Sequence, residues 1–238
     1  MIEANHKKFA HLIFNIIVFS GPIFFGLQKK FGFCDKIFPA FISAFFSAIP
    51  FVVWDALVTN IHWSFNENYI LGIKFWSLPI EEILFFISVP FACIFLWEMI
   101  IQNSRDRFSF SMFYFYSVSA IFFLLSSLLF YFGKIYSGLV FFALLVMVII
   151  DFFSSKIAFR RHFYIFSGFV LLAILIFNGY LTARPMVLYS GKYITNLRIF
   201  TIPLEDIGYG FSLIYLASAV YEKLKKSINV RKKTIFIK

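Results

Sequence analysis

The sequence predicts an all-α membrane protein, a polytopic bundle of about seven transmembrane helices with a parallel internal repeat. Of the 238 residues, 61% are hydrophobic and only 14% are charged, and the mean hydropathy is +0.85. Soluble domains have about 25% charged residues. Seven apolar runs are long enough to cross a bilayer, and one motif occurs twice at a fixed offset. Little sequence remains for a soluble domain.

The apolar runs predict helices at residues 9–27, 37–58, 78–100, 111–132, 137–153, 161–182 and 202–222. Each falls within the range of about 17 to 25 residues that a helix needs to cross the hydrocarbon core. The first run follows two lysines, as a signal peptide would, but no small-residue cleavage site follows it, so we expect a retained helix. The third and seventh runs contain Pro79 and Pro203 at their heads, where proline is favoured.

The net charge of +10 does not indicate nucleic-acid binding, because the basic residues lie in short loops and in a tail from Lys223 to Lys238. Under the positive-inside rule, an inner C-terminus places 15 of the 22 Lys and Arg residues inside, although Lys7 and Lys8 oppose this orientation. We therefore expect an integral protein of a bacterial cell (cytoplasmic) membrane, with a cytoplasmic C-terminus. The inner set comprises the tail and Lys29, Lys30, Lys36, Arg105, Arg107, Lys156, Arg160 and Arg161.

An internal duplication emerges when each residue i is set against residue i+124. Residues 69–98 then align with 193–222 without a gap, and unrelated apolar helices would not share a basic residue, a hydroxyl, a proline and two acids in register. We expect two halves, residues 1–108 and 109–238, that form one membrane domain. The matches include Lys74/Arg198, Ser77/Thr201, Pro79/Pro203, Glu81/Glu205, Glu82/Asp206, Ser88/Ser212, Trp97/Tyr221 and Glu98/Glu222.

The repeat also predicts where the polar groups of the membrane meet. The runs 37–58 and 78–100 match the runs 161–182 and 202–222, which lie four spans later and so have the same orientation. The polar residues at the ends of these runs therefore share one leaflet, whichever way the protein is inserted. They are Asp55, Thr59, Glu81, Glu82, Asn178, Thr182, Glu205 and Asp206.

A single Pro-x-Glu-Glu is an ordinary helix start, because acids there are stabilised by free N–H groups and by the helix macrodipole. Two such starts in register at membrane depth instead indicate function, since ionisable groups there are costly. Adjacent carboxylates titrate as a coupled set, so one can stay protonated while another is ionised. The sequence thus favours an acid and a base in one pocket.

Helical periodicity suggests which acid of each pair faces inward. Glu81 shares a stripe with Phe85, and Glu205 shares one with Tyr209, so these stripes are expected to face the bundle interior. The second acids are expected to orient or tune the first. Further polar residues near the inner ends, namely Glu98, Asp151 and Glu222, are expected to be solvated.

Two glycines and three tryptophans have two interpretations each. Gly208 and Gly210 remove side chains beside the second acid pair, either for close helix packing or to make room for a flat ligand. Tryptophans near the predicted ends of the spans favour an interface belt, with a pocket wall as the alternative. They are Trp54, Trp63 and Trp76.

Missing motifs narrow the chemistry, and we expect no cofactor and no metal. No G-x-G-x-x-G or P-loop pattern is present, the last run has no central lysine for a retinal Schiff base, and no run of spaced aspartates would hold a diphosphate. Cys34 and Cys93 have no disulfide or metal spacing. The histidines form no box of the membrane di-iron type, and only the third lies near the acids; they are His6, His11, His62 and His162.

The chain resembles the membrane-integral lycopene β-cyclases, which are encoded as two small subunits in some bacteria and fused in other organisms. The resemblance rests on the duplicated Pro-x-Glu-[Glu/Asp], on the segment from Trp54-Asp55 through Trp63-Ser-Phe-Asn66 to Gly72-Ile73, and on the number of spans. It covers essentially the whole chain in fused form. The second half departs from the pattern with Asn178 opposite Asp55 and with no tryptophan matching Trp63.

The resemblance implies proton-driven, non-redox closure of a β-ring at the linear end of lycopene or a related polyene that enters from the lipid. It implies Glu81 and Glu205 as proton donor or acceptor, and an aromatic wall that stabilises a carbocation. Lipids are the other expected partners, and a homo-oligomer is possible. The remaining site candidates are Glu82 and Asp206 as further catalytic acids, and Asp55, Thr59, Trp63, Asn178, Thr182, Phe85 and Tyr209 as binding or tuning residues.

Two alternative functions stay open. A related carotenoid end-group hydratase would trap the same cation with water, which Thr59 and Thr182 could position. A proton- or cation-coupled transporter could use the same acids. The parallel repeat and the single-leaflet clustering are less typical of a transporter, whose sites are often built from inverted repeats and broken helices at the membrane midplane.

Overall fold

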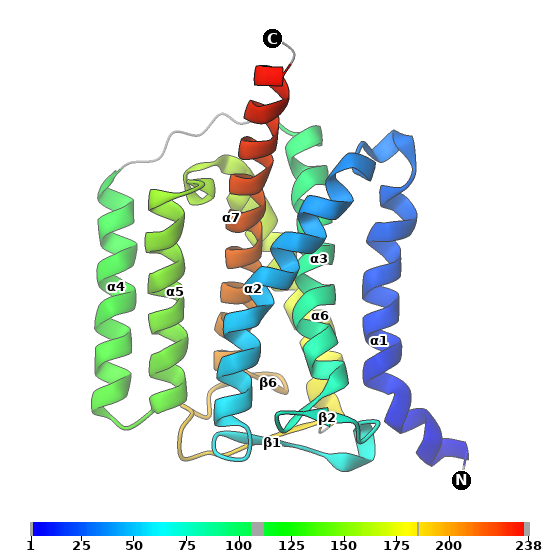
Figure 1. The fold of residues 1–238 in the computed structure, drawn as a ribbon. Coiled ribbons are helices and arrows are strands. Elements are labelled where there is room, and N and C mark those ends of the chain that lie inside the picture. The colour runs from blue at the N-terminus through cyan, green and yellow to red at the C-terminus, as the bar shows by residue number, and fades with distance from the viewer. Residues whose placement is uncertain (1, 106–111, 185, 236–238) are drawn as a thin grey trace.

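The computed structural model describes residues 2–105, 112–184 and 186–235, and in this part of the chain seven long helices form one bundle (Figure 1). The termini lie at opposite ends of the bundle, as an odd number of spans requires. The prediction of an all-α bundle is confirmed. The helices are α1 (Ile2–Gly26), α2 (Ile37–Val58), α3 (Ile80–Asn103), α4 (Met112–Tyr131), α5 (Ile135–Phe153), α6 (Arg161–Ala183) and α7 (Leu204–Ile235).

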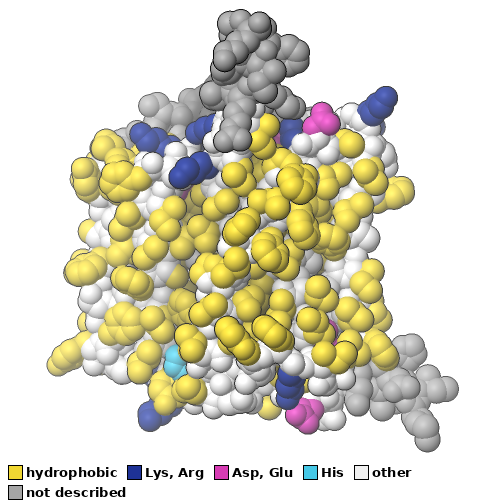
Figure 2. All heavy atoms as spheres, in the orientation of Figure 1, with side chains coloured by type: hydrophobic (Ala, Val, Ile, Leu, Met, Phe, Trp, Pro, Cys, Tyr) yellow, Lys and Arg dark blue, Asp and Glu magenta, His cyan; other side chains and the backbone are white. Residues whose placement is uncertain are grey.

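The surface of the bundle is that of a membrane protein. Six helices, α1 to α6, are long and apolar enough to cross a bilayer, and α7 combines an apolar middle with acids at its start and lysines toward its end. Figure 2 shows hydrophobic side chains over the broad middle of the molecule, with charged side chains at its two ends. The predicted inner residue Arg107 and the predicted boundary between the halves, at 108/109, lie outside the described residues.

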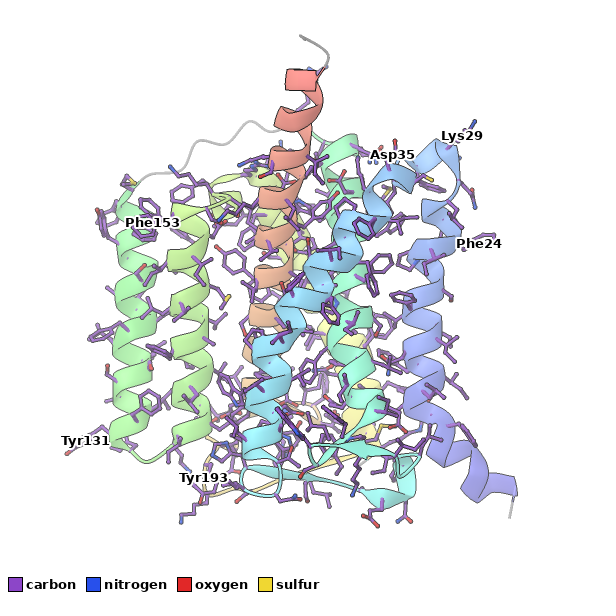
Figure 3. All side chains as sticks on the ribbon, viewed as in Figure 1. Phe24, Lys29, Asp35, Tyr131, Phe153 and Tyr193 are labelled. Atoms are coloured by element: carbon purple, nitrogen blue, oxygen red, sulfur yellow. The ribbon has the colours of Figure 1, made fainter. Side chains whose placement is uncertain are left out.

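The core lies where α3 and α7 pack against each other, with α2 and α6 on either side of them. Figure 3 shows the side chains of these helices on the ribbon. α1 packs on α3 and α5 packs on α7, whereas α4 stands at the edge of the bundle against α5. Residues of α3 and α7 such as Phe91, Ile94 and Ala217 are at most 1% exposed. The two halves therefore share one core, since the central helix of each half packs against that of the other.

Short hairpins precede α3 and α7 and are built alike. β2 (Lys74–Phe75) pairs with β3 (Leu78–Pro79), and β5 (Arg198–Ile199) pairs with β6 (Ile202–Pro203), in the same register at an offset of 124. The tight turns need positive φ angles, at Trp76 (49°), Ser77 (69°) and Phe200 (56°). Each hairpin leads directly into the acid pair at the start of its helix.

A second pair of strands marks a pseudo-twofold axis that runs along the bundle. β1 (Trp63–Phe65) pairs antiparallel with β4 (Val187–Tyr189), joining Trp63 to Tyr189, Ser64 to Leu188 and Phe65 to Val187. Adding 124 to the number of each β1 residue gives the corresponding β4 residue. The Trp63–Tyr189 pair and the Phe65–Val187 pair are therefore related by exchanging the two halves. Two equivalent strands that pair in this way are related by a twofold axis, which passes between Ser64 and Leu188. The predicted parallel repeat is thus visible in the structure.

At the opposite end of α3 and α7, the two repeats exchange hydrogen bonds. Trp97 Nε1 donates to Glu222 Oε1 (3.1 Å), and Tyr221 OH donates to Glu98 Oε1 (2.9 Å). Trp97 and Tyr221 are repeat partners, as are the two glutamates, so one interaction is made twice across the axis. It joins the two halves at the end far from the acid pairs.

The expectation that these glutamates are solvated is wrong. Glu98 and Glu222 are at most 3% exposed, because each has a cation from its own half: Lys36 lies 2.6 Å from Glu98 Oε2, and Arg160 lies 3.0 Å from Glu222 Oε2. Lys225 contacts both carboxylates. A buried charge is tolerated only when it is paired in this way.

Asp151 is also buried, contrary to expectation. Its carboxylate accepts hydrogen bonds from the hydroxyls of Ser155 and Tyr215, and from the backbone N–H groups of Ile157 and Ala158. It therefore closes the turn between α5 and α6, where the short helix η4 (Ile157–Phe159) lies.

We predict that Lys225→Met destabilises the folded protein by about 1–3 kcal/mol. This is less than the ~3–5 kcal/mol of a pair that loses its only cation, because Lys36 and Arg160 still pair with the two glutamates. Thermal unfolding of the detergent-solubilised protein measures the loss. Lys223→Met removes an exposed lysine from the same helix turn and serves as the control. Equal melting of both variants would contradict the role of Lys225.

Candidate active site

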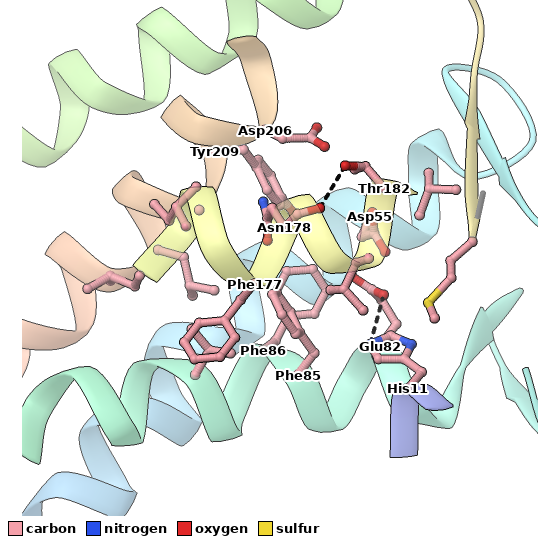
Figure 4. A pocket seen from close by; sticks show the side chains of 18 of the residues that line it. His11, Asp55, Glu82, Phe85, Phe86, Phe177, Asn178, Thr182, Asp206 and Tyr209 are labelled. Atoms are coloured by element: carbon pink, nitrogen blue, oxygen red, sulfur yellow. Dashed lines mark hydrogen bonds and ion pairs between the residues drawn. The ribbon is translucent and has the colours of Figure 1, made fainter. Parts of the chain in front are cut away.

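A cavity lies between α3, α6 and α7 at the end of the bundle that carries the acid pairs, and it is bordered also by α1, α2 and the β1–β4 pair. Figure 4 shows Glu82, Asp206 and Asp55 arranged around it from three different helices. Its volume is about 150 Å³, close to that of an engineered apolar cavity that binds benzene. The space suits an occupant of the size of one ring.

The cavity lies on the pseudo-twofold axis and is built from both halves. Six pairs of described residues related by the repeat line it together: Trp63/Val187, Phe65/Tyr189, Glu82/Asp206, Phe85/Tyr209, Phe86/Gly210 and Val89/Leu213. Asp55 and Asn178, which correspond with a one-residue shift, also line it. The duplicated motif therefore gives a single site with two halves, and the predicted clustering of the polar groups is present.

The first acid of each pair, which the periodicity favoured as the inward-facing one, does not line this cavity. Glu81 Oε1 accepts a hydrogen bond from Leu71 N (2.6 Å), and Glu205 Oε1 accepts one from Thr195 N (2.8 Å). Leu71 and Thr195 are repeat partners, so each carboxylate closes the loop that leads to its own helix. Glu205 Oε1 also accepts hydrogen bonds from the hydroxyls of Ser137 and Thr195.

The second acid of each pair lines the cavity, because successive residues of a helix point about 100° apart. Asp206 accepts hydrogen bonds from the phenols of Tyr189 and Tyr136, the latter at 3.4 Å. Glu82 has no such donor among the described residues, and His11 Nε2 lies 3.9 Å from its Oε2 atom. The two halves thus present one carboxyl group with two phenol donors and one without.

The third carboxyl group of the cavity belongs to Asp55, near the end of α2. Its side chain is 3% exposed, and Oδ2 has no hydrogen-bond partner within the described part of the chain. Three carboxyl groups in one poorly hydrated space share their protons rather than ionise together. Such a set can both give and take a proton.

Tyr189 stands outside the helices, in β4, and keeps its proton. Burial, followed by the charge of Asp206 and the hydrogen bond to it, raises the pKa of the Tyr189 phenol well above its ordinary value. The phenol therefore remains a neutral donor to Asp206 at all physiological pH values.

Aromatic rings form much of the wall. The ring of Tyr209 lies 5.5 Å from Trp54 and 5.2 Å from Phe51, and the ring of Trp63 lies 4.8 Å from Tyr136. Phe85, Phe86 and Phe177 complete the wall in Figure 4. The π faces of such rings attract a cation when water is excluded.

The remaining predicted residues divide between the cavity and its support. Trp63, Asn178 and Thr182 line the cavity, whereas Thr59 is buried beside it and donates to the backbone of Asp55. Thr182 makes the matching bond to Asn178 O at 2.7 Å. Both threonine hydroxyls therefore bond to their own helix.

The two glycines of α7 have different surroundings. A Cβ atom on Gly208 would lie 2.5 Å from Val140, so this glycine permits the close packing of α5 on α7. Gly210 instead lines the cavity, as does its repeat partner Phe86. The close-packing interpretation thus applies to Gly208, and room for a flat ligand at Gly210 stays a prediction.

Sequence reasoning missed three residues of the site. Tyr136 and Tyr189 belong to no recognisable sequence motif. Only the register of β1 with β4 brings Tyr189 to Asp206. The expectation that His62 alone of the histidines lies near the acids is wrong, because α1 brings His11 to the cavity, which His62 does not line. Among the described residues, no group of three or more His, Cys, Asp or Glu side chains is placed to hold a metal ion.

The cavity continues toward the middle of the bundle as an apolar branch between α1, α3 and α6, lined by Val18, Val89, Cys93, Ala173 and Ile174. α1 meets α6 here through the rings of Phe14 and Phe177, whose centroids are 5.4 Å apart. Phe177 lines the cavity and is 42% exposed. The apolar branch therefore ends close to the lipid-facing side.

Comparison with known proteins gives one match. The family model described as lycopene cyclase matches residues 8–100 and 133–224. These segments contain α1–α3 and α5–α7, so each matched segment is a three-helix unit and α4 lies outside both. No curated protein and no solved structure matches significantly. Because the family model matches two segments that together cover most of the chain, the chain is an integral membrane protein that belongs to the lycopene cyclase family, the carotenoid cyclases.

Proposed function

We propose that the protein is a lycopene β-cyclase of the intramolecular lyase (isomerase) type, which closes β-rings on linear carotenoid ends without redox chemistry. The observation that carries the proposal is the convergence of Glu82, Asp206 and Asp55 on one aromatic-walled cavity of ring size. The family match supports the substrate class. The reaction itself needs an acid, a base and a dry, cation-stabilising wall.

Glu82 is the proton donor in this proposal. No hydrogen-bond donor within the described residues stabilises its ionised form, and two other carboxyl groups share the cavity with it, which favours the neutral acid. It gives its proton to the terminal double bond of the linear end. The neighbouring double bond attacks the resulting cation and closes the six-membered ring, and loss of a ring proton leaves the ring double bond.

Asp206 serves as the counter-ion of the cation. The two phenols that donate to it favour its ionised form. A fixed negative charge at one side of the cavity stabilises positive charge that develops next to it, at no cost of reorganisation. Tyr209, Trp63 and Phe85 present their rings to the same space.

Glu81 and Glu205 are positioning residues. Each holds the loop before its helix through a backbone N–H group, and neither borders the cavity. This role differs from the donor or acceptor role that the sequence favours. It is supported by the equivalent hydrogen bonds in the two halves.

The substrate reaches the cavity from the lipid between α1 and α6, where Phe14 and Phe177 meet. A volume of about 150 Å³ accommodates the end to be cyclised, so the rest of the polyene lies in the apolar branch and in the membrane. With a cytoplasmic C-terminus in a bacterial cell membrane, this site lies in the outer leaflet. Basic side chains at the C-terminal end of the bundle support that orientation.

Expression in a lycopene-accumulating bacterium, followed by pigment analysis, tests the function. We expect lycopene to be replaced by carotenoids with β-rings. Hydroxylated, unringed ends would show a hydratase instead. Unchanged lycopene, with the protein folded in the membrane, would contradict both.

Glu82→Gln is expected to abolish ring formation, because glutamine cannot donate the proton and general acid catalysis contributes about 10²–10⁴-fold. The same pigment assay measures it, with the amount of folded protein followed by detergent size-exclusion chromatography. Glu67→Gln changes an acid that is 81% exposed and pairs with Lys74, and it should leave ring formation unaltered. Normal ring formation by Glu82→Gln would refute its role as donor.

Glu81 offers a sharper distinction between positioning and catalysis. Glu81→Gln keeps an oxygen that accepts the Leu71 N–H group, so we expect it to retain at least about a tenth of the activity, whereas Glu81→Ala should lose most of it together with stability. Glu81→Ala leaves the Leu71 N–H group without its acceptor, which lowers the free energy of unfolding by about 1–3 kcal/mol. If Glu81 transferred the proton itself, both variants would be equally inactive.

A further inference from the structure

His11 is a buried base that faces the proposed proton donor. It lies on α1, is 4% exposed and lines the cavity. Its Nε2 atom has no hydrogen-bond partner within the described residues and lies 3.9 Å from Glu82 Oε2. Among the described residues that line the cavity, it is the only basic side chain. Figure 4 shows the imidazole and the Glu82 carboxyl group side by side.

The position of His11 is fixed by a polar contact one helical turn away. Asn15 Nδ2 donates to Glu81 O (2.9 Å), and Asn15 Oδ1 accepts from Ser88 Oγ (2.6 Å). These bonds hold α1 against the first turns of α3. The His11 ring also contacts Phe85, with centroids 6.1 Å apart. A polar ring with an unpaired nitrogen is costly inside a membrane helix, so the placement of His11 beside an acid indicates function.

The other half of the site has a different side chain in the corresponding contact. Asp206 is the repeat partner of Glu82, and the ring side chain that reaches it from α5 is the phenol of Tyr136. α5 opens the second matched segment as α1 opens the first. A phenol next to a carboxylate only donates, whereas a neutral imidazole can take up a proton and pass it on. The two halves have therefore diverged at this contact.

We infer that His11 is the base that removes the ring proton after cyclisation and returns it to Glu82. This inference rests on the cyclase reaction proposed above. Glu82 loses its proton to the terminal carbon–carbon double bond, and the second double bond forms the new ring bond. The neutral Nε2 atom of His11 then takes the proton from the ring carbon next to the cation, whose C–H electrons become the ring double bond.

The last step restores the starting state. Imidazolium Nε2 passes its proton to the Glu82 carboxylate, a transfer that needs a movement of about 1 Å from the present 3.9 Å separation to hydrogen-bond distance. Protons and electrons balance over the cycle, and no solvent proton is consumed. Because the base selects which C–H bond is broken, His11 also determines the position of the ring double bond.

The test compares His11→Gln and His11→Ala with the wild-type protein in lipid vesicles that contain lycopene. We expect the rate of ring formation to fall about 100-fold in both, the lower end of the range for general acid–base catalysis. The residual product should contain more hydroxylated ends or rings with a displaced double bond. Added imidazole should restore at least about a tenth of the lost rate to His11→Ala, which leaves space for it beside Glu82. His62→Gln, a buried histidine that does not line the cavity, is the matched control and should keep the wild-type rate.

Two results would overturn the role of His11. One is a folded His11→Gln protein with the wild-type rate and product. The other is a His11→Ala protein that imidazole does not restore and whose residual product has the wild-type isomer composition, as a purely structural residue would give. Failure of the proposed function is distinguishable, since the wild-type protein would then form no rings in the same vesicles.

Discussion

The site depends on one interaction, the hydrogen bond between the first carboxylate of each acid pair and a backbone N–H group of the preceding loop. Glu81 and Glu205 make this bond at equivalent positions in the two halves. A carboxylate at membrane depth must find donors, and the loop supplies them locally. Once the first acid is satisfied in this way, the helix directs its neighbour, Glu82 or Asp206, toward the axis between the halves.

Duplication then yields one site rather than two. The pseudo-twofold axis passes through the β1–β4 pair and places repeat-related residues on facing walls of a single cavity. The two halves differ at positions that line the cavity: Asp55 corresponds to Asn178, and Phe86 corresponds to Gly210.

Hydrogen bonds hold both ends of α3 and α7 in place, which preserves the shape of the cavity. At one end the loops are held by the first acids, and at the other the crossed bonds of Trp97 and Tyr221 join the halves. Groups that are already in place when charge develops stabilise it without reorganisation. The buried ionic cluster of Glu98 and Glu222 thus supports the site from the far side of the membrane without taking part in its chemistry.

The sequence alone determined the seven helices, the parallel repeat and the meeting of the polar groups at one end, because long apolar runs and a motif in register are local signals. It also pointed to the four acids. Its periodicity favoured Glu81 and Glu205 as the inward-facing acids, but their neighbours Glu82 and Asp206 line the cavity. Adjacent helix residues differ by about 100° in direction, and the loop bonds of Glu81 and Glu205 settle the choice. Only the tertiary structure brought His11, Tyr136 and Tyr189 to the acids and buried Glu98 and Glu222, because those contacts join segments far apart in the chain.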